Sequence, residues 1–530
     1  MDVRILDTTF RDGAQSLWAM AIRHGMMEPV AADMDNAGFA VIEVPANAIH
    51  FKKYIRDLKE NPFDLMRMLA RKMPRTPKAA MGGGLNLNLF GTPTPPALGK
   101  LFQKTLFDIG ALNRIQTTCN TADQLTRQLP TLAPFLKGVG YKLALAISYS
   151  ISPRHTDEHY AEKTRGAAAL KPDTIYLKDQ GGLLTVDRLR TLMPIIMKEA
   201  GSIPVELHSH CTTGLAPLVY AEALKLGVKT LHCGIPPLAD GPAQPSVLDM
   251  IHNARLMGYS IDLDEKLLQS VSKRLYAIAR QDNMPLGEPT RYDYAQYIHQ
   301  IPGGVISNLR FQLSEIGLAH RLDAVIRECI QIRADLGYPI MITPFSQFVG
   351  TQAAINVATG KRYNVVIDEL IRFAQGVFGE DSGYTWMDQN LKDNWLALPR
   401  AKELAALGKR PIDDISLEEC RQKFGAPGIS DEELMMRAIM GGAREIEAMV
   451  AAGPPKRYLT SDMPLAMLLN EMKKFKTIRY LQIQHGADSI TLQNRGRDAA
   501  PRAAGATQPA ATAAHAPVAS QTKESGGALS

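Results

Sequence analysis

The stretch IPVELHSHCTTGLAPLVYAEALKL, residues 203–226, contains one complete strand–helix unit. Its first part places Ile203, Val205 and Leu207 at every second position, which is typical of a buried strand. Its second part, 215–226, repeats apolar residues at helical spacing. A strand followed directly by a helix of this length is the building block of a parallel sheet.

The same unit recurs along the first 260 residues. We expect eight strands, at 3–8, 39–44, 78–82, 112–117, 142–149, 174–178, 203–208 and 229–235. Eight such units predict a closed parallel (β/α)8 barrel, or TIM barrel, which takes ~250 residues. A doubly wound open sheet is the alternative. In a barrel, catalytic side chains gather at the C-terminal ends of the strands.

Polar residues stand at or just after three of these strand ends: Asp12, Lys178, His208 and His210. The two histidines share one face of a strand because they lie two residues apart. One carboxylate and two imidazoles form a ligand set for a divalent metal with open positions. A buried lysine can lose its proton and take up CO2 as a carbamate, which offers oxygen to a metal. The alternatives are a hydrogen-bonded histidine pair and an ion pair of Lys178 with Asp179 or another acid.

Three motifs in this region resemble the carboxyltransferase domain of biotin-dependent carboxylases. They are LDTTFRDGAQS at 6–16, YLKDQGGLLT at 176–185 and ELHSHCTTGLA at 206–216. The resemblance continues in YIHQIPGGVISNL at 297–309, RADLGYPIMITPFSQFVGTQAAINVATGKRY at 333–363 and GISDEELMMRAIM at 428–440, so it covers most of residues 1–440. That family includes pyruvate carboxylase, the oxaloacetate decarboxylase α subunit and the pyruvate-handling subunit of transcarboxylase.

The resemblance implies a role for each residue at these strand ends. Asp12, His208 and His210 would bind the metal, for which the ligand types indicate Zn²⁺, with Mn²⁺ or Co²⁺ as alternatives. Lys178, carbamylated, would be the fourth ligand and take part in catalysis.

The resemblance also implies three residues that act on the substrates. Thr343 would carry a proton between biotin and the acceptor enolate, and Gln15 would bind the acceptor. Arg11 would bond the enolate or support Asp12. From the residues alone, the preferred interpretation of Thr343-Pro344 is a helix N-cap followed by proline at the first helical position, and that of Arg11 is a structural ion-pair partner. The resemblance favours the catalytic role of Thr343, and both of its roles can coexist.

The sequence departs from the family pattern around the acceptor. Residues 44–51 read VPANAIHF where the family has Trp-Gly-Gly-Ala-Thr-Phe-Asp, and the arginine that grips the acceptor carboxylate is Gly83 here. Gln116-Thr117 replaces the Phe-Asp that the family has after the fourth strand. Ala14 replaces the histidine that the family has directly before the glutamine at position 15. Without that arginine, the acceptor carboxylate loses a partner that would bind both of its oxygens, which argues against an ordinary pyruvate pocket. Lys52, Lys53 and Arg56 are candidates for a cation that binds the acceptor carboxylate in its place. The alternative is that these three residues form a solvated helix face.

Composition predicts an enzyme of more than one domain without a membrane span. The chain has 530 residues, 45% of them hydrophobic, and a net charge of +6 without the basic stripe expected of a nucleic-acid binder. Five cysteines without CxxC spacing predict a reducing compartment, so we expect a cytoplasmic protein. Neither a signal peptide nor 18 consecutive apolar residues is present. We expect a homo-oligomer.

Three domains are predicted: a barrel over 1–300, a mostly helical region over 301–490 and a disordered Ala/Pro-rich tail over 491–530. Two short strands are expected within 478–494. The sequence has neither an Ala-Met-Lys-Met biotinylation motif nor a Gly-rich ATP-grasp region. Biotin would therefore be carried on a separate protein, and the partners would be a biotin carboxyl carrier protein and a biotin carboxylase subunit.

The sequence thus predicts a carboxyltransferase subunit that moves CO2 between carboxybiotin and a small carbonyl acceptor, such as a 2-oxo acid, through a metal-stabilised enolate. It would serve a carboxylase or a decarboxylase. Two alternatives stay open. One is a metal-dependent barrel aldolase, lyase or Claisen-type synthase that does not use biotin. The other is a catalytically silent assembly subunit.

Overall fold

The computed structural model describes 2–88, 93–301, 306, 309–310, 313–314, 317–342, 344–379, 384–408, 414–425, 428–460, 480–485 and 488–493. Residues 1–462 form one compact unit and 463–530 a second. The predicted disordered tail lies outside the described residues from 494 onward, and so does Thr343.

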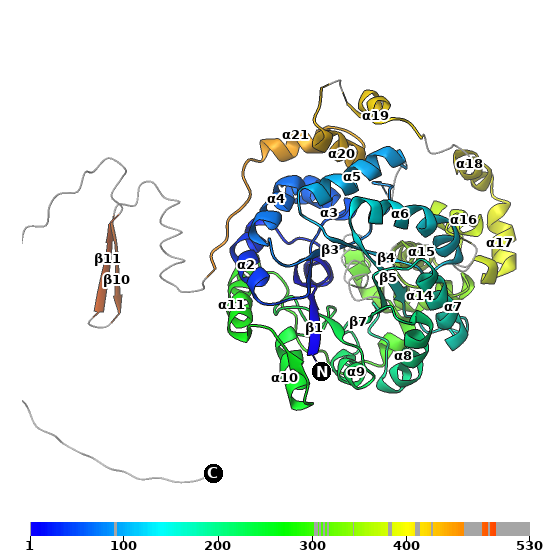
Figure 1. Cartoon of the computed structure of the whole chain (residues 1–530). Coiled ribbons are helices and arrows are strands. Elements are labelled where there is room, and N and C mark those ends of the chain that lie inside the picture. The colour runs from blue at the N-terminus through cyan, green and yellow to red at the C-terminus, as the bar shows by residue number, and fades with distance from the viewer. Residues whose placement is uncertain are drawn as a thin grey trace, which may run out of the picture. The chain divides into compact units, whose positions relative to one another are not determined.

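The first unit is built on a closed barrel of eight parallel strands (Figure 1). They are β1 Asp2–Asp7, β2 Val41–Glu43, β3 Lys78–Met81, β4 Arg114–Thr118, β5 Lys142–Ser148, β6 Thr174–Asp179, β7 Val205–Ser209 and β8 Thr230–Cys233. Each pairs with the next along the chain, and β1 closes the ring by pairing with both β8 and β2. The predicted barrel is confirmed and the open sheet is excluded.

Helices follow the strands and surround the barrel (Figure 1). They are α2 His24–Asn36, α4 Pro62–Lys72, α5 Pro96–Asp108, α6 Leu129–Val139, α7 Asp157–Ala169, α8 Val186–Ala200, α9 Ala216–Lys225 and α10 Val247–Leu256. Local sequence sets where several of them begin: the Thr156 and Thr185 hydroxyls accept the first-turn N–H groups of α7 and α8. Short β9 Ser260–Ile261 joins the start of β1, and α11 Glu265–Gln281 follows it.

Short helical turns occupy several loops at the carboxyl ends of the strands and beyond. They are η1 Thr9–Gly13, α1 Ala14–Trp18, α3 Ala48–Lys53, η2 Tyr54–Leu58, η3 Gln124–Gln128, α12 Ala295–His299, η4 Ala319–Arg321 and η6 Tyr384–Trp386. The π-helical turn η1, directly after β1, matters most here, because it carries Arg11 and Asp12 over the end of the barrel.

The region after the barrel is mostly helical, as predicted. Its helices are α14 Leu322–Asp335, α15 Phe345–Thr359, α16 Asp368–Ala374, α17 Gln389–Leu396, α18 Pro399–Gly408, α19 Leu417–Phe424, α20 Asp431–Met440 and α21 Arg444–Ala451. Helices α14 to α17 share an apolar core of their own. The later helices α19, α20 and α21 instead add their apolar side chains to the barrel's core, where α20 contacts α3 and α5 (Figure 1).

The second unit contains the antiparallel pair β10 Tyr480–His485 and β11 Asp488–Gln493. This confirms the two strands predicted within 478–494. Among the described helices of the chain, none combines the length and the apolar character that crossing a membrane requires.

Candidate metal centre

The carboxyl ends of β1, β6 and β7 bring the four predicted metal-site residues together. Asp12 lies in η1, Lys178 is the next-to-last residue of β6, His208 lies in β7, and His210 follows that strand directly. The ligand atoms of Asp12, His208 and His210 all lie within 4.8 Å of one another, and all three side chains are buried.

The distances within this group are those of a compact site. His208 Nε2 lies 3.4 Å from Asp12 Oδ2, and His210 Nε2 lies 3.6 Å from Asp12 Oδ1. The two Nε2 atoms are 3.1 Å apart. Lys178 Nζ lies 3.8 Å from Asp12 Oδ2. The convergence predicted from strand ends is therefore present.

Hydrogen-bond partners fix the tautomers of both histidines. His210 Nδ1 lies 2.6 Å from Pro242 O, which can only accept, so Nδ1 carries the proton. His232 Nε2 lies 2.9 Å from a Glu206 carboxylate oxygen and is likewise the donor. His232 Nδ1 then accepts from His208 Nδ1, 3.1 Å away. Both His208 and His210 therefore keep an unprotonated Nε2, and these lone pairs face one another.

Burial disfavours the charged form of both imidazoles. It lowers the pKa of His208 well below its usual value, and the Lys178 ammonium lowers it further. It also lowers the pKa of His210, although Asp12 opposes the shift. Two nitrogen lone pairs and a carboxylate that converge in a buried space repel one another unless a cation lies between them. The donor set therefore fits a divalent metal bound by two imidazoles and a carboxylate.

Arg11 organises the carboxylate side of the site. Its guanidinium bonds both Glu43 oxygens, at 2.8 and 2.7 Å, and lies 2.8 Å from Asp12 Oδ2. Burial alone would raise the pKa of Asp12, but the adjacent Arg11 guanidinium holds it well below its usual range. Asp12 is therefore ionised and ready to bind a metal. Arg11 supports Asp12, as expected, and is also a structural ion-pair partner.

Lys178 does not pair with its neighbour in sequence. The Asp179 carboxylate accepts the backbone N–H groups of Leu183 and Leu184 and the Ser209 hydroxyl, each at 2.8 Å. Asp179 is therefore not the partner of Lys178, because adjacent residues of a strand face opposite sides. The ion pair of Lys178 is with another acid, Asp12, at 3.8 Å. Burial lowers the pKa of Lys178, and Asp12 only partly offsets this shift.

Four further residues complete the site but were not predicted. Gln244, in the loop after β8, places Nε2 3.1 Å from His208 Nε2 and 3.0 Å from His210 Nε2. Behind His208, the buried chain continues through His232 and Glu206 to Arg114, which bonds both Glu206 oxygens at 2.9 and 2.6 Å. Burial would raise the pKa of Glu206, but Arg114 and His232 lower it to about 2.

Sequence could have revealed part of this chain. Glu206 lies two residues before His208 and therefore shares its face, and His232 lies between Leu231 and Cys233 in β8. Gln244 has no comparable signal because it lies in a loop.

The residues predicted around the acceptor have mixed outcomes. Gln15 is exposed on α1, and its role stays a prediction. Pro344 takes the N-cap position of α15 and not the first helical position expected of it. Lys53 and Arg56 both pair with Asp57, at 3.1 and 2.6 Å, so these two cations are already engaged in the helical stretch after β2.

Gly83 cannot simply be exchanged for the family's arginine. Its φ of +90° lies in the left-handed region, and a Cβ there would come within 2.4 Å of the Ile115 side chain and 3.5 Å of Leu136. A side chain at this position would therefore enter the packing between β4 and α6.

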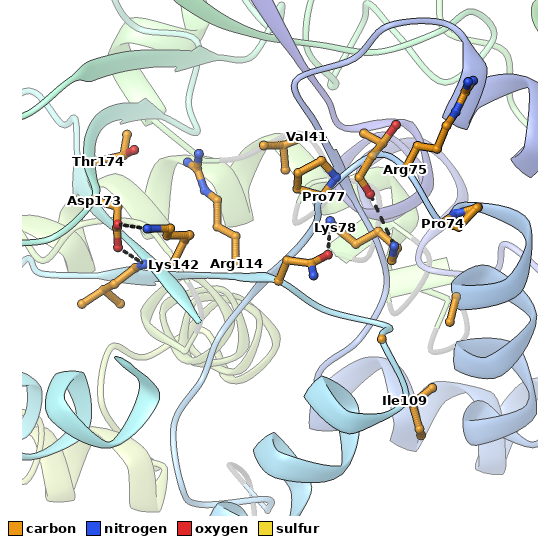
Figure 2. Close-up of a pocket in the computed structure, with 15 residues that line it drawn as sticks. Val41, Pro74, Arg75, Pro77, Lys78, Ile109, Arg114, Lys142, Asp173 and Thr174 are labelled. Carbon is orange, nitrogen blue, oxygen red and sulfur yellow. Dashed lines mark hydrogen bonds and ion pairs between the residues drawn. The ribbon is translucent and has the colours of Figure 1, made fainter. Parts of the chain in front are cut away.

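A cavity of about 620 Å³ lies at the opposite end of the barrel (Figure 2). It is lined by the first residues of β2 to β6, which are Val41, Lys78, Arg114, Lys142 and Thr174. The metal-site residues instead follow the last residues of their strands. Because barrel enzymes act at the carboxyl end, the cavity is not the candidate active site.

The fold and the donor set define a class: a barrel protein whose carboxyl end is suited to hold a divalent metal. Comparisons with known proteins show which family within this class the chain resembles. The HMGL-like family matches residues 2–273, and the conserved carboxylase domain matches residues 297–444.

Relatives and solved structures agree with these family matches. A pyruvate carboxylase subunit of Methanocaldococcus jannaschii is 35% identical over 71% of this chain and 66% of that protein. The corresponding pyruvate carboxylase subunit of Methanothermobacter thermautotrophicus is 32% identical over 81% of this chain and 74% of that protein. The carboxyl transferase domain of Rhizobium etli pyruvate carboxylase superposes with a TM-score of 0.73 at 21% identity, over 85% of this chain and 77% of that one.

The chain belongs to the HMGL-like barrel proteins and, among them, to the carboxyltransferases of the biotin-dependent carboxylases. The match beyond the barrel distinguishes this branch from biotin-independent barrel lyases and synthases. The matched region spans just under two thirds of the M. jannaschii relative. The R. etli structure, at 21% identity, bears on the fold alone.

Proposed function

We propose that this chain transfers CO2 between carboxybiotin on a separate carrier protein and a small 2-oxo acid, at a metal held by Asp12, His208 and His210. The convergence of two unprotonated Nε2 atoms and an ionised carboxylate carries the proposal. Imidazole and carboxylate ligands favour Zn²⁺, with Mn²⁺ or Co²⁺ as alternatives. Such a metal would polarise the acceptor carbonyl and stabilise the enolate as a Lewis acid.

We propose that Lys178, carbamylated, is the fourth ligand. Its amine lies 3.8 Å from Asp12 Oδ2 and is buried beside the other ligands. Its lowered pKa raises the fraction of neutral amine, the form that attacks CO2. The N–C bond formed releases one proton and leaves a carbamate, whose oxygen atoms are suited to a divalent cation.

The remaining roles are assigned by residue type and position. Arg11 holds Asp12 in place, and its N–H groups are the cationic donors next to a developing enolate oxygen. Gln15, exposed on α1, would bind the acceptor at the mouth of the site. Thr343, which lies outside the described residues, would carry a proton between biotin and the acceptor.

The relatives are named for pyruvate, which makes pyruvate and oxaloacetate the first compounds to test. A changed acceptor is nevertheless expected, because Gly83 offers no guanidinium and Lys53 and Arg56 are paired. Loss of a charge-assisted clamp costs about 1.5–3 kcal/mol, or about ten- to a hundredfold in affinity.

Both archaeal relatives are named as one subunit of a pyruvate carboxylase, which supports separate partner proteins, here a biotin carboxyl carrier protein and a biotin carboxylase. A homo-oligomer remains part of the proposal. All five cysteines are free and buried, which agrees with a reducing compartment such as the cytoplasm.

The test is decarboxylation of a panel of 2-oxo acids by the purified chain, with and without free biotin. We expect turnover that requires biotin and is absent in His208→Ala. Carbon–carbon cleavage at the same rate with and without biotin would contradict the proposal and favour a lyase. Robust turnover of oxaloacetate at micromolar concentration would refute the proposal that the acceptor has changed, but not the proposal of carboxyl transfer.

A further inference from the structure

Gln244 lies beside the two histidine Nε2 atoms, at a position where a further ligand of a metal bound by both histidines would stand. Its Nε2 is 3.1 Å from His208 Nε2 and 3.0 Å from His210 Nε2, and the side chain is fully buried. Because both histidine Nε2 atoms are unprotonated, the carboxamide must present its NH2 group to them. The opposite orientation would set the amide oxygen against two lone pairs.

This orientation leaves the other end of the carboxamide unsatisfied. Gln244 Oε1 is buried and has no hydrogen-bond partner among the described residues. A buried acceptor without a partner costs about 1–3 kcal/mol, so the metal-free arrangement is not the one that satisfies this side chain.

The backbone that carries Gln244 is anchored on both sides. Gln244 O accepts the Asp240 N–H at 2.7 Å, and Gly234 N–H donates to Pro245 O at 3.1 Å. Pro242 O, in the same loop, receives the His210 Nδ1 proton. The loop therefore fixes the carboxamide and orients one histidine, and only the side chain of Gln244 is left to rotate.

We infer that Gln244 is a ligand of the divalent cation, and that its carboxamide turns over when the cation binds, so that the amide oxygen replaces the NH2 group at the site. In the metal-free chain its NH2 group satisfies the two imidazole lone pairs. Once those lone pairs bind a cation they no longer accept, and N–H groups aimed at a cation are repelled. Rotation about the last side-chain torsion puts Oε1 in that place within the same volume, without backbone movement. Amide oxygen is an ordinary ligand of divalent cations.

The inference rests on the proposed metal site, and Co²⁺ is the probe that tests it. Cobalt is titrated into metal-free full-length chain, and both its affinity and its visible absorption are measured. Gln244→Leu removes the oxygen, Gln244→Asn keeps a carboxamide that is one methylene too short, and Gln244→Glu supplies a charged carboxylate oxygen at the same chain length. Exposed Gln128→Leu is the matched control, and thermal unfolding of each metal-free variant checks its fold.

We expect the absorption of bound cobalt to change in Gln244→Leu and in Gln244→Asn but not in the control. Gln244→Glu should bind cobalt at least about tenfold more tightly than Gln244→Leu, because its oxygen is retained and charged. Identical spectra for the wild type, Leu and Asn variants would overturn the inference, even if affinity fell, because Gln244 would then act only through the histidines. A wild-type chain that binds no cobalt would instead overturn the metal site and the proposed function.

Discussion

The two ends of the barrel differ in how their charged and polar groups are satisfied. At the amino end, the cations around the cavity are matched. Lys142 pairs with Asp173 at 3.0 Å (Figure 2). Arg114 bonds Glu206, and Lys78 Nζ donates to Met73 O at 2.6 Å. At the carboxyl end, two unprotonated imidazole nitrogens converge with a carboxylate in a buried space.

The difference shows that cavity volume is a poor guide to function in this molecule. The amino end has the space, but the cations Lys142, Arg114 and Lys78 are already bonded to carboxylates or a carbonyl, so it serves stability. The carboxyl end holds buried electron-pair donors that the protein itself satisfies only in part, which is typical of a site completed by a ligand. A buried hydrogen-bonded chain joins the two ends of the barrel, because Arg114 lines the cavity and also bonds Glu206, which lies behind His208.

The largest effect is expected from removing a metal ligand. His208→Ala should lose the metal and reduce carboxyl transfer by about a thousandfold or more, since a Lewis acid contributes several kcal/mol to the barrier. Elemental analysis and the biotin-dependent assay measure both losses. Equal metal content in wild type and variant would show that the site is not real.

The next effect is expected from Lys178. Lys178→Ala should lower transfer by about a hundredfold or more while the fold persists, because a metal ligand is lost. Carbon-13 NMR after growth in labelled bicarbonate should show a carbamate signal in the wild type that is absent in the variant. Lys178→Arg, which keeps a positive charge but forms no carbamate, should be equally inactive. Full activity in Lys178→Ala would exclude the carbamate.

A smaller effect is expected from the chain behind His208. His232→Phe removes the acceptor of the His208 Nδ1 proton, and loss of such a partner costs about ten- to a hundredfold in metal affinity. Competition with a chromogenic chelator measures the change, and exposed His252→Ala is the matched control. Unchanged affinity in His232→Phe would mean that the tautomer of His208 is fixed in another way.

The pH dependence of metal binding distinguishes this buried site from an exposed one. Because burial lowers the pKa of both His208 and His210, they stay unprotonated as the pH falls through 6.5, the ordinary histidine value. Metal affinity should therefore change less than about threefold between pH 8 and 6.5 and fall only at lower pH. A tenfold fall already complete at pH 6.5 would contradict the stated direction of these shifts.

The smallest effect is expected at the amino end. The Lys142 side chain is 72% exposed, so Lys142→Met should change the free energy of unfolding by no more than about 1 kcal/mol. Metal content and transfer should not change. A loss of activity in this variant would show that the cavity takes part in function and would remove the contrast between the two ends.

The sequence predicted the barrel because each strand–helix unit carries its own periodicity, which needs no tertiary information. It placed Asp12, His208 and His210 together because a barrel brings strand ends to one rim. The Lys178–Asp179 pair was wrong for a reason visible in the sequence, since adjacent strand residues diverge.

Other parts of the site were beyond sequence reasoning. The bond between Arg114 and Glu206 joins β4 to β7 across the barrel interior, and no local pattern encodes it. Gln244 reaches the histidines only through the course of the loop after β8. The close packing of Gly83 against Ile115, a residue of another strand, likewise has no local sequence signal.

The most direct test is a crystal structure of protein purified without chelator, with diffraction data collected on both sides of the zinc absorption edge and, if needed, the manganese and cobalt edges. We predict an anomalous peak bonded to Asp12 and to the Nε2 atoms of His208 and His210. A refined site that holds only water in metal-replete crystals, or a metal bound solely in the cavity at the amino end, would contradict the account.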